Sequence, residues 1–136
     1  MGNAIAVIIS HCRAPVGACK IQTLRSPTQR IEQGDAVIRH IVMWKLKEHA
    51  EGASRAENAL KLKEKLESCR DIVPGILKLE VGIAAPGLES SYDIVLVSDF
   101  ADKTALDAYQ VHPTHEAIKG FVGAVREARQ AVDYEI

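Results

Sequence analysis

Two segments of this chain, residues 37–47 and 92–100, have the composition of β-strands and are apolar on both faces. In the first segment Val42 and Trp44 lie on one face, and Met43 lies on the other. Side chains alternate between the two faces of a strand, so this pattern indicates strands that are covered on both sides. The fold must therefore bury both faces of these two strands.

The remaining patterns place helices and further strands around this pair. Apolar residues recur at helical spacing over residues 59–73, and the alternation over 77–83 predicts a strand whose odd-numbered residues are buried. Asp102 stands at the N-cap of a helix that Pro113 interrupts, and Pro113 can open a second helix. Residues 132–136 alternate again and predict a closing strand. The order β-α-β-β-α-β predicts an α+β fold, the ferredoxin-like plait, whose antiparallel sheet carries its helices on one face.

Such a plait leaves the second face of its sheet exposed to water. An apolar face of that size is normally covered by a partner, and a second copy of the same chain is the usual one. We therefore predict a homodimer in which the sheets pack face to face. The interface is expected to include Ile41, Met43, Val95 and Val97, or their even-numbered neighbours if the two faces are reversed.

The first quarter of the chain differs from the rest. None of the six aromatic residues precedes position 44, and the apolar run of residues 4–9 is too short for a secretory signal. We predict that residues 1–36 are a leader outside the packed domain and that residues 37–136 form one domain.

Charge and composition exclude several classes of function. A net charge of −1, with lysines and glutamates interleaved, offers no basic surface for nucleic acid or an anionic membrane. No apolar run reaches the length of about 18 residues that a membrane span needs. The three cysteines are too few for a disulfide framework and lack the spacing of metal ligands. We predict a cytoplasmic protein that holds no metal and no cofactor.

The candidate site lies where Pro113 interrupts the second helical region. Tyr109, His112 and His115 fall within seven residues there, and the chain has only five histidines. Imidazole is the side chain best suited to moving a proton near neutral pH. His40 shares a strand face with Trp44 and can reach the same space between sheet and helices. Trp44 and His112 are further candidates for lining a site there.

The segments IRHIVMWKLK (38–47) and YQVHPTH (109–115) resemble the stress-responsive dimeric A/B barrel (Dabb) domain family. The resemblance covers residues 37–136 and is sharpest at the histidine–proline motif. It implies a dimeric α/β barrel, in which each chain has a pocket between its sheet and its helices. Most members of the family have no assigned reaction, although one plant member is a polyketide cyclase that closes a ring by an aldol-type condensation.

The resemblance to that cyclase implies a catalytic role for His115, Tyr109 and His40, which match its working pair and its strand histidine. A neutral imidazole can take an acidic proton, and a phenol can hold the developing oxyanion. The chain would then be a small-molecule enzyme such as a polyketide-cyclase-like aldol cyclase.

The same residues also suit a structural role, which we favour because the motif recurs across a family with few known reactions. His112 can cap the interrupted helix, and His115 can bond a backbone carbonyl in the first helical turn. The chain would then be a non-catalytic or ligand-binding dimeric module. A metal site built from His40, His112 and His115 is less favoured, because no carboxylate or cysteine lies beside them at ligand spacing.

Overall fold

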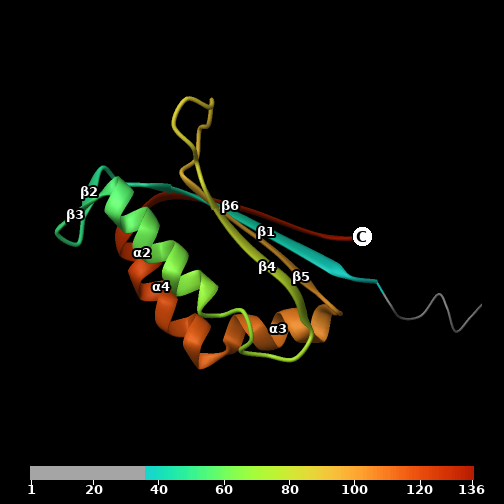
Figure 1. Ribbon diagram of the computed structural model, residues 1–136. Helices are drawn as coiled ribbons and strands as arrows, with labels where there is room; N and C mark the ends of the chain where they lie inside the picture. The colour runs from blue at the N-terminus through green and yellow to red at the C-terminus, as the bar shows by residue number, and fades with distance from the viewer. Residues whose placement is uncertain (1–35) are drawn as a thin grey trace, which may run out of the picture. The chain divides into compact units, whose positions relative to one another are not determined.

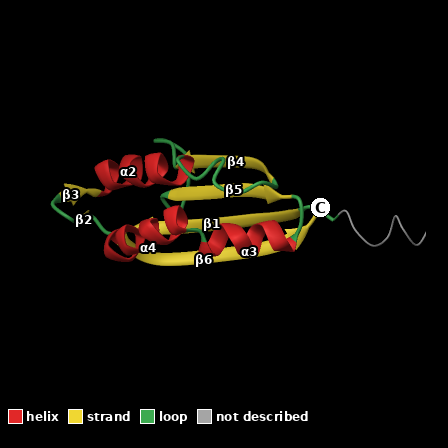
Figure 2. Ribbon diagram, turned by 90° about the horizontal axis from the view of Figure 1, so that it is seen from below, coloured by secondary structure: helices red, strands yellow, loops and turns green. Residues whose placement is uncertain are grey.

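The computed structural model describes residues 36–136, so nearly all of the predicted leader lies outside the described residues. The elements are β1 (Ile38–Leu46), β2 (His49–Ala50), β3 (Ala53–Ser54), α2 (Arg55–Glu67), β4 (Ile76–Ile83), β5 (Ile94–Phe100), α3 (Lys103–Val111), α4 (Pro113–Val125) and β6 (Arg126–Glu135). Four strands form an antiparallel sheet in the order β4-β5-β1-β6. The helices lie on one face of this sheet (Figures 1 and 2). The predicted ferredoxin-like plait is confirmed.

The two faces of the sheet have different surroundings. On β1 the even-numbered residues from position 40 to 46 are buried against the helices, among them Val42 and Leu46. The odd-numbered residues face away from the helices, and Met43 is 37% exposed. Leu96 of β5 pairs with Val42 and is buried as well. The core therefore lies between the sheet and the helices, and the opposite face of the sheet is open in the single chain.

Local signals position the helices. The hydroxyl of Ser54 accepts a hydrogen bond from the backbone N–H of Glu57, whose carboxylate accepts one from the Ser54 backbone, so a capping box starts α2. The Asp102 carboxylate accepts a bond of 2.8 Å from the backbone N–H of Ala105 and starts α3. Pro113 is the first residue of α4, where its missing N–H is not needed. The predicted helix start at Asp102 and the predicted interruption at Pro113 are confirmed.

Gly75 allows the chain to pass close beneath α3. Its φ is +94°, and a Cβ atom there would lie 2.8 Å from the Cβ of Ala105. Only glycine satisfies both conditions without strain. The turn that leads into β4 can therefore lie directly against α3.

Three features differ from the expectations. The helix α2 ends at Glu67, before the predicted end at residue 73, because the chain turns after it. Leu77 was expected to be buried but is 58% exposed, because the register between β4 and β5 shifts between Ile76 and Lys78. The last strand β6 begins at Arg126, six residues before the alternation that predicted it.

Among the described residues, each helix is too short or too polar to cross a membrane.

Candidate functional site

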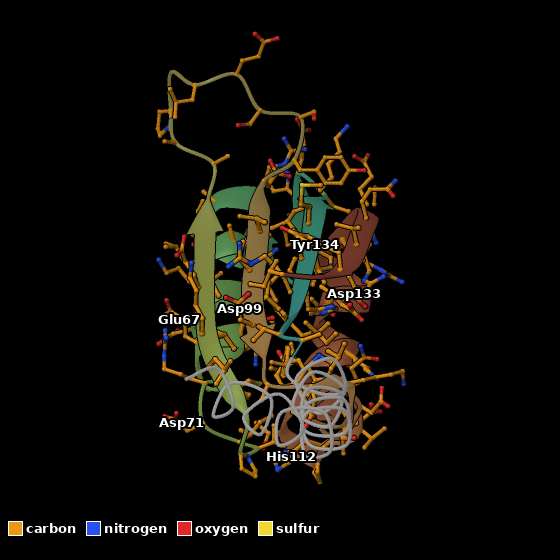
Figure 3. The ribbon with its side chains drawn as sticks, turned by 90° about the vertical axis from the view of Figure 1, so that its right-hand side faces the viewer. Glu67, Asp71, Asp99, His112, Asp133 and Tyr134 are labelled. Atoms are coloured by element: carbon orange, nitrogen blue, oxygen red, sulfur yellow. The ribbon has the colours of Figure 1, made fainter. Side chains whose placement is uncertain are left out.

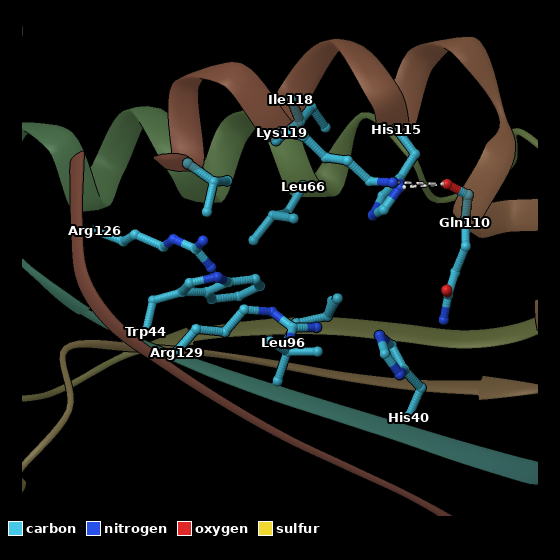
Figure 4. A pocket seen from close by; sticks show the side chains of 12 residues that line it. His40, Trp44, Leu66, Leu96, Gln110, His115, Ile118, Lys119, Arg126 and Arg129 are labelled. Atoms are coloured by element: carbon cyan, nitrogen blue, oxygen red, sulfur yellow. Dashed lines mark hydrogen bonds between the residues drawn. The ribbon is translucent and has the colours of Figure 1, made fainter. Parts of the chain in front are cut away.

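A cavity of about 330 Å³ lies between the sheet and the helices (Figure 4). Strands β1 and β5 supply its floor, helices α2 and α4 supply its roof, and the start of β6 closes one side. Its lining consists of His40, Val42, Trp44, Leu66, Leu96, Gln110, His115, Ile118, Lys119, Val122, Arg126 and Arg129. Half of these residues are apolar and half are polar or charged, so the cavity offers both apolar contacts and hydrogen-bonding groups to a small molecule.

His40 lies on the cavity floor and is oriented by a carboxylate of the neighbouring strand. It pairs with Asp133 in the β1–β6 register, and its Nδ1 atom lies 2.5 Å from Oδ1 of Asp133. Only 5% of His40 is exposed. The carboxylate can accept the proton of Nδ1, and in the neutral ring the second nitrogen is then an acceptor. Figure 4 shows the ring of His40 extending from β1 toward the roof of the cavity.

His115 faces the same cavity from the first turn of α4. Its Nδ1 donates to the backbone carbonyl of Gln110 over 3.2 Å, and the ammonium of Lys119 also donates to that carbonyl. Gln110 belongs to the last turn of α3, where carbonyls lack partners within the helix. Burial lowers the pKa of the His115 imidazole below its ordinary value. At neutral pH His115 is therefore an uncharged side chain that joins two helices and lines a cavity.

Tyr109 lies behind His115 and does not line the cavity. Its ring packs between Phe100 and His115, with centroid distances of 5.1 and 4.5 Å. The residue is completely buried, and its hydroxyl makes no hydrogen bond within the described residues. Burial raises the pKa of the phenol well above its ordinary value. The phenol is therefore separated from the space that His40 faces.

His112 has a capping position. Its Nδ1 accepts a hydrogen bond of 3.1 Å from the backbone N–H of Thr114 at the start of α4. In Figure 3 His112 lies well apart from Asp133, the partner of His40. Among residues 36–136, no three His, Cys, Asp or Glu side chains are grouped as metal ligands would be.

Of the five residues singled out in the sequence, the structure brings His40, Trp44 and His115 to one cavity and leaves Tyr109 and His112 outside it. The bond of His115 goes to a carbonyl of the preceding helix, whereas we expected one in its own first turn. The catalytic and pocket roles of these residues stay predictions.

Sequence reasoning missed Arg126 and Arg129, because the polar start of β6 does not resemble a strand. The only sequence signal for the two arginines was that they precede Asp133, which the predicted closing strand contains. Arg129 lies four residues before Asp133 on the same strand, so both side chains are on the helix-facing side.

The fold and the cavity define an α+β plait with a ligand-sized space under its helices. The family model of the stress responsive A/B barrel domain (Dabb) matches residues 38–136, and the chain belongs to this family.

Solved structures share the fold. A dimeric protein of unknown function from Bacteroides fragilis is 29% identical, with a TM-score of 0.62 and coverage of 74% of this chain and 96% of that one. A dimeric ferredoxin-like protein of unknown function from Jannaschia is 28% identical, with a TM-score of 0.58 and coverage of 74% and 99%. The hydroxynitrile lyase from Passiflora edulis is 20% identical, with a TM-score of 0.58 and coverage of 74% and 93%, which is a likeness of fold alone. No curated protein matches the chain.

Proposed function

We propose that this chain is a homodimeric module that binds a small molecule in the cavity between sheet and helices. The observation that carries the proposal is the cavity itself: about 330 Å³ of space, with His40 and His115 facing it from opposite layers. A buried histidine with only a packing role would have both ring nitrogens hydrogen-bonded within the protein. Here each imidazole has one nitrogen bonded to the protein and the other available to a ligand.

The open face of the sheet supports the homodimer. Ile41, Val95 and Val97 are half-buried there in the single chain, and Val132 and Tyr134 are largely exposed. The main charged groups on this face already neutralise each other, because Arg39 forms two bonds of 2.7 and 2.8 Å to Asp99. A second sheet could therefore cover this face without isolating a charge. The relatives from Bacteroides fragilis and Jannaschia are described as dimeric.

A second candidate is an acid–base enzyme, and the Asp133–His40 pair favours it. A carboxylate on one ring nitrogen makes the other a suitable proton acceptor, and the cavity could place an acidic C–H or O–H group beside it. A Tyr109–His115 pair, as in an aldol cyclase, is not favoured, because the phenol lies behind His115.

Filling the cavity tests the proposal. Val122 lines it, whereas Val111 of α3 is exposed on the surface, so Val122→Phe and Val111→Phe form a matched pair. Binding of a library of small aromatic compounds would be measured by ligand-observed NMR, and the fluorescence of Trp44, the chain's only tryptophan, would report on the cavity. We expect Val122→Phe to abolish binding and Val111→Phe to retain it. Equal binding by both variants, or no binding by the wild type, would contradict the proposal.

A further inference from the structure

The lysine and arginine side chains that line the cavity face no carboxylate in its lining. Lys119, Arg126 and Arg129 contribute to its lining, whereas no aspartate or glutamate of residues 36–136 does so. The whole chain has a net charge of −1. Positive charge is therefore concentrated at the cavity, although the chain as a whole has a slightly negative net charge.

Two of these cations have no partner among residues 36–136. Lys119 pairs with Glu116 on its own helix. Three other arginines of the described residues, Arg39, Arg55 and Arg70, bond carboxylates or carbonyls. The side chains of Arg126 and Arg129 make no ion pair or hydrogen bond within residues 36–136. Their guanidinium groups, each with five donors in a planar fork, are available to a ligand.

A β-bulge brings the two guanidinium groups to the same side of the sheet. Residues three apart on a regular strand point to opposite faces. Here Arg129 pairs with Trp44 and Arg126 with Leu46, and the register shifts between them, so that both share the helix-facing side. Bulges often re-aim a side chain next to a functional site.

The indole of Trp44 adds a third unused donor. Trp44 is 5% exposed, and its buried Nε1 atom has no hydrogen-bond acceptor among the described residues. A buried donor without a partner is unfavourable, and an acceptor on a ligand would remove this cost. Figure 4 shows Trp44 and Arg126 at one end of the cavity and the two histidines at the other, with Arg129 on the floor between them.

We propose that Arg126, Arg129 and Trp44 Nε1 bind the carboxylate of a small organic acid, whose apolar body extends along Val42 and Leu96 toward the histidines. This inference rests on the proposed ligand-binding function and names the class of ligand. A planar carboxylate matches the guanidinium fork. At about 30 Å³ for each water-sized group, the cavity of about 330 Å³ holds roughly ten to twelve non-hydrogen atoms.

Two probes of equal size separate charge from shape. The acid 3-phenylpropanoate and its neutral amide, 3-phenylpropanamide, have the same number of non-hydrogen atoms and suit this volume. Binding of each to the full chain would be measured by isothermal titration calorimetry. We expect the acid to bind about tenfold more tightly than the amide.

Charge-removing variants then locate the contact. We expect Arg126→Gln and Arg129→Gln each to weaken the acid about fivefold and to leave the amide within about twofold, because both residues are exposed and water screens their charges. Lys61→Gln removes the same charge from an exposed position on α2, away from the cavity, and should change neither affinity.

Two results would overturn the inference. If the amide binds as tightly as the acid and Val122→Phe blocks both, the ligand-binding function stands and the carboxylate site is wrong. The same holds if the double variant Arg126→Gln/Arg129→Gln keeps its affinity for the acid. If neither probe nor any library compound binds the wild type, the proposed function fails together with this inference.

Discussion

Replacing His115 by alanine tests whether this residue holds the two helices together. The substitution removes the hydrogen bond to the Gln110 carbonyl, which is worth about 0.5–1.5 kcal/mol net. It also removes the ring that packs on Tyr109 with a centroid distance of 4.5 Å, and this contact is worth about 0.5–1.5 kcal/mol more. Lys119 still donates to the carbonyl, so no buried acceptor is left without a partner. We expect a loss of about 1–3 kcal/mol in the free energy of unfolding.

Chemical denaturation at fixed protein concentration measures this loss, since a dimer's stability depends on concentration. His49 is exposed on β2, and His49→Ala, as the matched control, should change stability by less than about 0.5 kcal/mol. A change of less than about 0.5 kcal/mol for His115→Ala as well would refute the structural role.

The same variant should alter the dependence of stability on pH. Burial holds the pKa of His115 in the folded chain below its ordinary value of 6.5. The unfolded chain therefore binds a proton first, and stability falls as the pH drops below about 6.5 until the folded pKa is passed. His115→Ala should lose this part of the decline. An unchanged stability difference between wild type and variant across that range would contradict the assignment.

Further predictions concern the rest of the domain. Tyr109→Phe removes a buried hydroxyl without a partner, so we expect unchanged or slightly higher stability, by up to about 1 kcal/mol, in denaturant titrations; a loss above that range would mean that the hydroxyl is bonded. Gly75→Ala places a Cβ 2.8 Å from that of Ala105 at a positive φ and should lower stability by about 1–3 kcal/mol; a neutral result in thermal melts would disprove the close approach. Ile41→Asp puts a charge on the open sheet face and should give monomers or aggregates in sedimentation, whereas a folded monomeric wild type at micromolar concentration would overturn the homodimer.

The amino-acid sequence by itself determined the elements that depend on neighbouring residues. Runs of β-branched and aromatic residues that are apolar on both faces specify β1 and β5, Asp102 starts α3, and Pro113 starts α4. These features arise within one or two turns of helix or a few residues of strand, because caps, proline and side-chain period act locally. The order of these elements then predicted the ferredoxin-like plait.

Only the tertiary structure decided which side chains meet at the cavity. His40 and Asp133 are 93 positions apart, and strand pairing alone brings them together. The bulge that aligns Arg126 with Arg129 depends on the register against β1, which the polar sequence of β6 does not encode locally. Tyr109 looked equivalent to His115 in the sequence, but packing against Phe100 placed it behind the cavity wall. Such placements are set by long-range pairing and packing, which a local pattern of residues does not contain.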